Sequence, residues 1–193
     1  MPKPKSQRRE DLLKASIEYL LENGVADLSL RPLAAKIGSK ARLLVYHFDS
    51  KDGLITDAML VVRERVRENF AALVSNSRNR KPSQIVQAFW AWATSRQHER
   101  YLRLFFEVHG LALQNPKQYG RYLEGAFTSW VELMGAILPV TLSRAERRAL
   151  ASLAVGTVVG LMLDYLSSGD KKRTSDAVAE FATAFDVLLR SKK

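Results

Sequence analysis

The side chains best suited to bind another molecule lie in one stretch of the sequence, from Ser29 to Lys51. Basic residues cluster there around a glycine, Gly38, at Lys36, Lys40, Arg42 and Lys51. Arginine can donate paired hydrogen bonds to the edge of a guanine, and lysine can reach bases or phosphate oxygens. The chemistry that these residues favour is therefore recognition of a nucleic acid.

Two short helices are expected to position these side chains. Leu33 and Ala34 lie on the apolar face of a helix predicted over 30–37, which Ser29 can cap and which Gly38 ends. A second helix is predicted over 39–48, with Leu44 and Phe48 facing a small core. This helix-turn-helix, over about residues 29–48, would place the outward face of its second helix in a DNA major groove.

The overall charge supports this interpretation only weakly. The chain of 193 residues has a formal net charge of +10, which suggests a polyanionic partner. Residues 1–52, however, hold 10 Lys and Arg against 7 Asp and Glu. The basic excess is thus spread along the chain, and only the placement of basic residues around Gly38 indicates DNA binding.

A family resemblance rests on the end of this stretch and on the helix before it. After a first helix over 6–23 that ends in Asn23-Gly24, the residues Gly38, Leu44, Tyr46-His47-Phe48, Asp49-Ser50-Lys51 and Leu54 resemble the DNA-binding domain of the TetR family of bacterial transcriptional regulators. The motif covers roughly the first quarter of the chain. The resemblance implies phosphate contacts from Tyr46, His47 and Lys51, and base-facing positions at Lys40, Ala41, Arg42 and Leu43.

The earlier half of the motif departs from the family. Members commonly have Gly-Val-Ser-x-Gly-Thr-Leu-Tyr where this chain has the run from Gly38 to Val45, GSKARLLV. We expect an altered operator preference from these changes. Two simpler interpretations stay open: Tyr46 and His47 could seal the domain core, and the basic residues could form an ordinary solvated surface.

Helical periodicity continues through the rest of the chain without sustained strand alternation. Helices are predicted over 51–75, 83–99, 100–114, 116–138, 143–167 and 174–190, with a polar loop over 76–82. Ser50 can cap the first of these helices, and Ser143 with Glu146 has the spacing of a capping box at the start of the helix over 143–167. The predicted fold is all-α, with about nine helices. An N-terminal helix-turn-helix DNA-binding domain (1–52) is joined by a long helix to a helical effector-binding and dimerisation domain (53–193).

Large aromatic side chains are concentrated in the middle of the chain. The resemblance implies a small-molecule pocket there, although core packing explains each of these residues equally simply. The candidate lining residues are Phe89, Trp92, Phe105, Phe106, His109, Tyr122, Phe127, Trp130 and Met134.

The last two predicted helices are unusually apolar, which indicates burial on nearly every side. In the family the corresponding pair forms a four-helix bundle with a second copy, and a monomer core is the alternative. The expected homodimer residues are Leu153, Thr157, Val158, Leu161, Tyr165, Phe181, Phe185 and Leu188.

Other classes of function have little support in the sequence. It contains no cysteine, no glycine-rich phosphate loop, no nucleophile with a base and no convincing metal site, since His98 and His109 do not share a helix face. We expect no enzyme activity and no cofactor. The apolar run 149–163 falls short of the ~20 residues that span a membrane, and a cytoplasmic location is expected.

These observations predict a ligand-responsive transcriptional repressor that binds double-stranded, palindromic operator DNA as a homodimer, with a small-molecule effector. The alternative is a helical module that binds a partner or has a structural role, without specific DNA recognition. That alternative explains the apolar helices but not the residues around Gly38.

Overall fold

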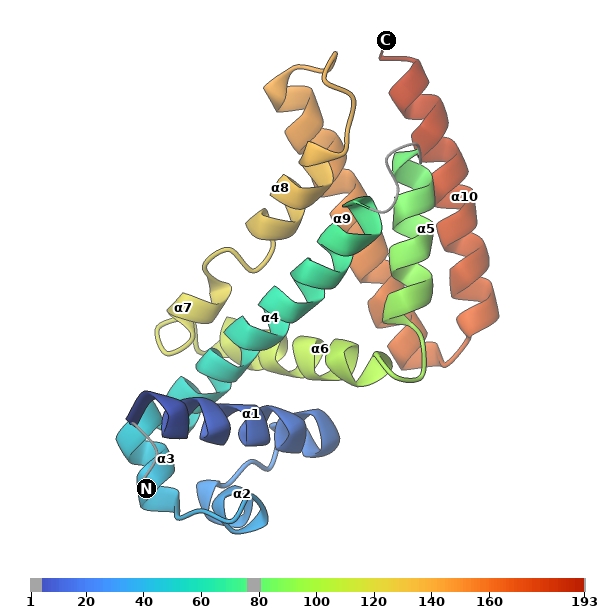
Figure 1. Cartoon of the computed structure of the whole chain (residues 1–193). Coiled ribbons are helices and arrows are strands. Elements are labelled where there is room, and N and C mark those ends of the chain that lie inside the picture. The colour runs from blue at the N-terminus through green and yellow to red at the C-terminus, as the bar shows by residue number, and fades with distance from the viewer. Residues whose placement is uncertain (1–4, 76–80, 193) are drawn as a thin grey trace. The chain divides into compact units, whose positions relative to one another are not determined.

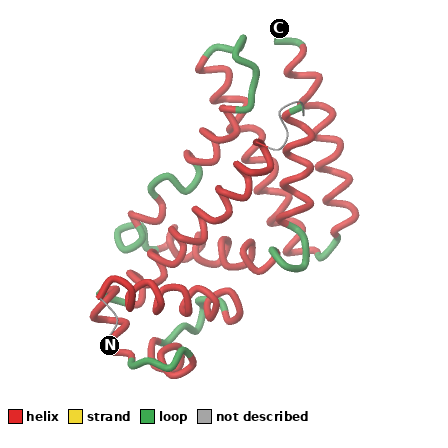
Figure 2. Tube along the Cα trace, viewed as in Figure 1, coloured by secondary structure: helices red, strands yellow, loops and turns green. Residues whose placement is uncertain are grey.

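The computed structural model describes residues 5–75 and 81–192, and every regular element in these two ranges is an α-helix (Figure 2). The all-α prediction is therefore confirmed. Ten helices lie in the described ranges, against about nine expected. In chain order (Figure 1) they are α1 (Lys5–Asn23), α2 (Leu30–Lys36), α3 (Ala41–Phe48), α4 (Lys51–Ser75), α5 (Pro82–Ala93), α6 (Glu99–Gln114), α7 (Gly120–Leu123), α8 (Thr128–Ala136), α9 (Arg144–Ser168) and α10 (Lys171–Arg190).

The chain divides into two compact units. Unit 1 comprises residues 1–65 and 100–124, and unit 2 comprises residues 66–99 and 125–193. Helix α4 begins in unit 1 and continues into unit 2 after Arg65. The units describe packing, and the functional division expected at residue 52 stays a prediction.

Unit 1 is built on the apolar stripes of α1 and α4. Because residues three and four apart share one face of a helix, each stripe buries a continuous row of side chains. The row on α1 is Leu12, Leu13, Ile17, Leu20 and Leu21, and the row on α4 is Leu54, Ile55, Ala58, Met59 and Val62. Together they form a core against which the short helices α2 and α3 can pack.

In unit 2, α5 packs along α10, and α9 packs against both α8 and α10. Hydrogen bonds fasten both ends of α5 to α10. Near its start, Ser83 Oγ donates to Asp186 Oδ2 at 2.8 Å, and near its end, Trp90 Nε1 donates to Ser175 Oγ at 3.0 Å. These two bonds fix the register of α5 on α10.

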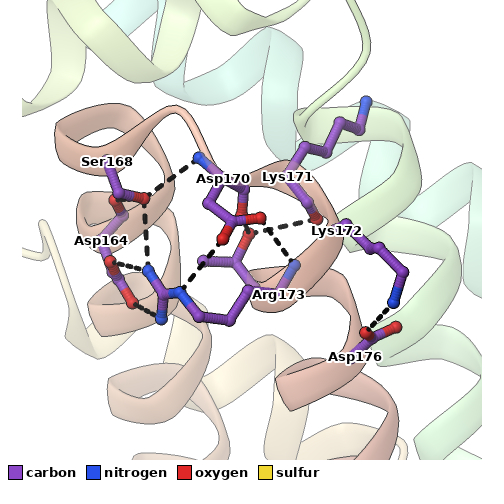
Figure 3. Close-up of polar contacts among 8 residues, drawn as sticks. Asp164, Ser168, Asp170, Lys171, Lys172, Arg173 and Asp176 are labelled. Carbon is purple, nitrogen blue, oxygen red and sulfur yellow. Dashed lines mark hydrogen bonds and ion pairs between the residues drawn. The ribbon is translucent and has the colours of Figure 1, made fainter.

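A polar cluster joins α9 to α10 at the turn between them (Figure 3). The guanidinium of Arg173 donates to both carboxylate oxygens of Asp164, at 2.8 and 2.7 Å, while Asp170 accepts the Arg173 backbone N–H at 2.9 Å. The hydrogen bond from Arg173 is the main cause that lowers the pKa of Asp164 below its ordinary value. The cluster therefore holds the two helices as a hairpin at neutral pH.

Two of the predicted helices differ from the structure by more than three residues. The helix predicted over 116–138 is two helices, α7 and α8, because Gly125 adopts a left-handed conformation (φ 71°) between them. The helix predicted over 83–99 ends at Ala93. In a continued helix the Thr94 carbonyl would accept a hydrogen bond from the N–H of residue 98. It instead accepts one from Lys171 Nζ at 2.6 Å.

The capping predictions had mixed outcomes. Ser143 and Glu146 form the expected capping box at the start of α9. Ser29 occupies the N-cap position of α2 with an extended backbone, but its side chain makes no capping hydrogen bond, so that expectation was wrong. The loop predicted over 76–82 lies mostly outside the described residues.

Candidate nucleic-acid interface

Helices α2 and α3 form the expected pair around Gly38. Gly38 has φ 67°, a conformation that favours glycine, and Ser39 N–H donates to the Ala34 carbonyl at 2.8 Å across the turn. Leu33 and Ala34 of α2 are buried in the core, at 0 and 2% exposure. The apolar side of α2 is thus fixed, which sets where α3 begins.

Helix α3 has one buried side and one exposed side. Leu44 and Phe48, four residues apart, are 0 and 2% exposed. Tyr46 is 61% exposed, and Arg42 is exposed on the same helix. Since Leu44 and Phe48 anchor one face, the other face can present these side chains to a partner.

The remaining predicted contact residues lie at or near this exposed side. Lys40 is exposed and occupies the N-cap of α3, because the helix begins at Ala41 and not at Ser39 as predicted. Ala41, Leu43 and His47 are half-buried. His47 lies between its neighbours, with its ring 5.0 Å from that of Tyr46, centroid to centroid.

The chain turns sharply between α3 and α4. Asp49 has φ 65°, and its N–H closes α3 by donating to the Val45 carbonyl at 2.8 Å. Ser50 then caps α4 as predicted, since its Oγ accepts the Gly53 N–H at 2.9 Å. A Cβ on residue 53 would overlap the Phe48 carbonyl oxygen, so glycine permits this close approach.

Lys51 is exposed and is the first residue of α4. Free backbone N–H groups and the positive end of the dipole at the start of a long helix favour an anion, and the Lys51 ammonium adds a full positive charge there. The exposed face of α3 and the start of α4 thus offer donors for base edges and for a backbone phosphate.

Sequence patterns missed a set of polar residues that support these helices. In unit 1, Asp57 of α4 is buried and binds arginines from α1 and α7, Arg9 and Arg121. Glu107 of α6 accepts the backbone N–H groups of Val25 and Ala26, at 2.8 and 2.6 Å. These partners are 48 to 82 residues apart in sequence, so no local pattern indicated them.

The residues predicted to line a ligand pocket fall into two groups, one in each unit. In unit 1, the His109 ring stacks on Phe105 at 5.4 Å and meets Tyr122 edge-on at 6.0 Å. Burial lowers the pKa of His109, which favours the neutral imidazole. The predicted residues of this group are Phe105, Phe106, His109 and Tyr122.

The second group forms an aromatic cluster in unit 2. Phe89 stacks on Trp92 at 5.7 Å and contacts Trp130 at the same centroid distance. Phe70 of α4, which sequence analysis did not include, meets both Phe89 and Trp130 edge-on. Met134 is buried, whereas Phe127 is 36% exposed.

The predicted dimer residues differ in how far unit 2 already buries them. Val158, Tyr165 and Phe185 are buried within the single chain, at 7, 8 and 1% exposure. Leu153 is 49% exposed, and Thr157, Leu161, Phe181 and Leu188 are half-buried. The surface available to a second copy is therefore the side of the α9–α10 pair that carries Leu153.

Helix α9 is long and apolar enough to cross a membrane by length and composition, and it is the one such helix among the described residues. A core helix of a soluble protein meets the same criterion. Only 33% of its most apolar window is buried within the chain. The chain alone therefore supplies only part of the burial that the sequence indicated, and burial by a second copy stays a prediction.

Within the described ranges, no group of three or more His, Cys, Asp or Glu side chains is arranged to hold a metal ion. His98 stacks on Trp92 at 4.2 Å, with its Nδ1 2.9 Å from Ser95 Oγ. His98 belongs to unit 2, whereas His109 belongs to unit 1 and stacks on Phe105 of that same unit. These two histidines have separate, local surroundings.

Comparison with known proteins singles out the same N-terminal stretch. The family described as "Bacterial regulatory proteins, tetR family" matches residues 12–58, from α1 into the first turns of α4. The HTH-type transcriptional regulator BetI from Stenotrophomonas maltophilia (strain R551-3) is 33% identical over 64 residues. These residues are 33% of this chain and 33% of BetI, so the match spans one third of that relative.

Solved structures are similar over nearly the whole chain. A transcriptional regulator from Rhodococcus sp. Rha1 has a TM-score of 0.76 at 17% identity, covering 92% of this chain and 95% of that one. The multidrug binding protein EbrR, complexed with imidazole, has a TM-score of 0.66 at 24% identity, with 95 and 96% covered. A protein from Saccharomonospora viridis in complex with choline has a TM-score of 0.68 at 16% identity, with 94 and 96% covered. At these identities the likeness establishes the fold.

Proposed function

We propose that this chain, which belongs to the TetR family of bacterial regulatory proteins, is a ligand-responsive repressor that binds a palindromic operator as a homodimer. The observation that carries the proposal is the two-sided character of α3. Leu44 and Phe48 anchor its inner face, and Arg42 and Tyr46 are exposed. A helix held in this way can enter a major groove without losing its packing.

Each predicted contact residue has a proposed role, and the exposure of Lys40, Arg42, Tyr46 and Lys51 supports theirs. Arg42 donates to a base edge, with Lys40, Ala41 and Leu43 beside it on the surface that faces the bases. Tyr46, His47 and Lys51 bind backbone phosphates, which fix orientation but carry no sequence information. Ser39 to Leu43, where the chain departs from the usual motif, then determine its operator preference.

A homodimer follows from the symmetry of the proposed operator and from the surface of α9. Two recognition helices must lie about 34 Å apart to read successive turns of one DNA face. The exposed Leu153 and the low burial of α9 support a twofold contact through the α9–α10 pair. In this proposal residues 1–52 bind DNA, and residues 53–193 dimerise and bind the effector.

The effector is proposed to be a small organic molecule bound by the aromatic residues that the sequence predicts as pocket lining. Aromatic and aliphatic side chains with a few polar groups are the usual lining of such sites. EbrR with imidazole and the S. viridis protein with choline are precedents of similar fold. A repressor of this kind would act in the cytoplasm, where its operator lies.

Helix α4 would connect the two events, because it begins beside the DNA-binding helices and continues into unit 2. Effector binding that shifts α4 would change the separation of the two recognition helices. The coupling free energy can be no larger than the effector's differential affinity for the two states.

The test is selection of binding sites from a random pool of duplex DNA at moderate salt, followed by footprinting. A repressor should enrich a palindrome whose half-sites are one helical turn apart. Enrichment of no sequence would overturn the proposal and favour the alternative of a helical partner-binding module. Adding candidate small molecules to the footprint then tests effector response, since unchanged operator affinity with a bound molecule would contradict it.

A further inference from the structure

Asp57 is a buried carboxylate at the centre of an ionic cluster in unit 1. It lies on α4, is 9% exposed, and both of its oxygens are paired. Oδ1 accepts a hydrogen bond from Arg121 of α7 at 2.8 Å, and Oδ2 pairs with Arg9 of α1. A buried carboxylate with two guanidinium partners holds those side chains in defined positions.

Arg9 uses this anchor to reach the last turn of α3. Its Nε donates to the His47 carbonyl at 3.4 Å, and its guanidinium lies over the Phe48 ring, 4.9 Å from the ring centroid. The last carbonyls of a helix have no intrahelical donor, and a cation is favoured at this end of the dipole. Arg9 therefore supplies both a hydrogen bond and a charge where α3 ends.

We propose that Arg9 is a positioning residue for DNA recognition: held by Asp57, it fixes the C-terminal end of α3 and so sets the direction in which Arg42 and Tyr46 are presented. The inference rests on the proposed function, because it assigns Arg9 a part in operator binding. It adds a residue outside the helix-turn-helix that touches no base.

The contacts favour arginine over lysine at this position. One planar guanidinium bonds in two directions, to Asp57 and to the His47 carbonyl, while its face covers Phe48. A lysine offers a single ammonium and no planar face, so it can keep the charge but not these contacts together. Recognition groups need placement within about 0.5 Å, so loosening one end of α3 should reduce specific binding.

Two other roles for Arg9 would give different results. Its side chain is 41% exposed, so it could bind a phosphate directly. In that case Arg9→Lys would retain binding, and loss of the charge would weaken all DNA sequences alike and reduce the salt slope by about 1. A purely structural role would change operator affinity only in step with stability.

The experiment compares Arg9→Lys, Arg9→Met and the double variant Arg9→Met/Asp57→Asn with the wild-type chain. Arg9→Met keeps an apolar stem near Phe48 but takes one guanidinium partner from the Asp57 carboxylate. Asp57→Asn then removes the negative charge of that carboxylate. Arg8→Met, an exposed neighbour on α1, is the matched control for the loss of one positive charge. Affinity for the selected operator and for a scrambled duplex, salt dependence and urea unfolding are measured for each.

We expect Arg9→Met and Arg9→Lys to weaken operator binding about tenfold or more, with little change for the scrambled duplex or the salt slope. The double variant should regain stability but not operator affinity. Arg8→Met should alter both duplexes equally. Recovery of affinity together with stability, or full activity of Arg9→Lys, would overturn the proposal.

Amide hydrogen exchange of α3 tests, without DNA, whether Arg9 holds the C-terminal end of this helix. The variants at Arg9 should exchange faster at the end of α3, around Phe48 and Asp49, while Arg8→Met should not. Unchanged exchange there would overturn the proposal whatever the DNA result. If the wild-type chain selects no sequence, the proposed function fails, and the exchange data still show whether Arg9 holds this helix.

Discussion

The phenol of Tyr119 donates a 2.5 Å hydrogen bond to Oδ1 of Asp52, the second residue of α4. Tyr119 is 1% exposed. Burial, and then the hydrogen bond and the charge of Asp52, raise the pKa of Tyr119 well above its ordinary value of 10.0. The contact ties the segment before α7 to the first turn of α4, next to Lys51.

Replacing Tyr119 by phenylalanine should lower the free energy of unfolding by about 1–3 kcal/mol at pH 7, because a hydrogen bond to a charged group is lost. The difference from wild type should shrink above pH 10. Above pH 10, Tyr119 ionises in the unfolded wild-type chain but stays protonated in the folded one, which lowers the wild-type free energy of unfolding. The variant has no phenol at this position and does not lose stability in this way.

Urea unfolding at pH 7 and at about pH 11 measures both effects. Tyr19→Phe, which removes a phenol from a half-buried position on α1, is the control. A gap between Tyr119→Phe and wild type that stayed constant with pH would contradict the assigned pKa direction.

Glu107 should behave as a capping residue for the turn after α1. Its Oε1 accepts two backbone N–H groups, from Val25 and Ala26, and Val25 is buried. Glu107→Ala should cost about 1–3 kcal/mol of stability, since both donors lose this acceptor. Glu107→Gln keeps an acceptor oxygen and should cost less.

Thermal or urea unfolding distinguishes these variants, with Glu22→Ala on the exposed side of α1 as the control. Faster hydrogen exchange of the Val25 amide in Glu107→Ala would locate the effect. Equal stability of Glu107→Ala and wild type would show that the two hydrogen bonds add nothing net.

The helical elements were predictable where local pattern determines them. The apolar spacing and Ser50 gave α4 its observed bounds, and Ser143 with Glu146 marked the start of α9. The end of α5 was not predictable, because Lys171, far along the chain, takes the Thr94 carbonyl. The break at Gly125 also lacked a proline or a polar cluster to mark it.

The candidate site also combines features that local periodicity predicts with contacts that depend on the tertiary fold. The outward face of α3 follows from its own periodicity, so the exposure of Arg42 and Tyr46 agreed with expectation. Arg9 and Asp57, 48 residues apart, are brought together only by the tertiary fold. Periodicity also cannot separate burial within a chain from burial by a second copy, and for this reason the exposure of Leu153 required the structure.

A charge on the exposed side of α9 should separate the proposed dimer without unfolding the chain. Leu153 is 49% exposed, so Leu153→Arg leaves the core intact but places an unpaired cation in the proposed interface. We expect the dimer to weaken by at least about 2 kcal/mol. Sedimentation over a range of concentrations measures this.

The matched control for this change is Val140→Arg, on the turn before α9, where Val140 is 87% exposed. It should leave the oligomeric state unchanged. Leu153→Arg should also lose binding to a full palindrome while retaining weak binding to a half-site. A dimer that Leu153→Arg left intact would exclude this face of α9 as the interface.

Arg42 and Lys51 should differ in what they contribute to DNA binding, since one is assigned to a base edge and the other to a phosphate. Arg42→Ala should cost about 1–3 kcal/mol on the selected operator and relax the choice at one base pair. Lys51→Ala should weaken the operator and a scrambled duplex in equal proportion, and reduce the salt slope by about 1. This comparison distinguishes the two roles, because both residues are exposed cations and overall charge alone would predict the same loss of DNA affinity for each. Titrations at several salt concentrations, with exposed Lys117→Ala as a control for charge, would refute the assignment if the two variants lost affinity for both duplexes in the same ratio.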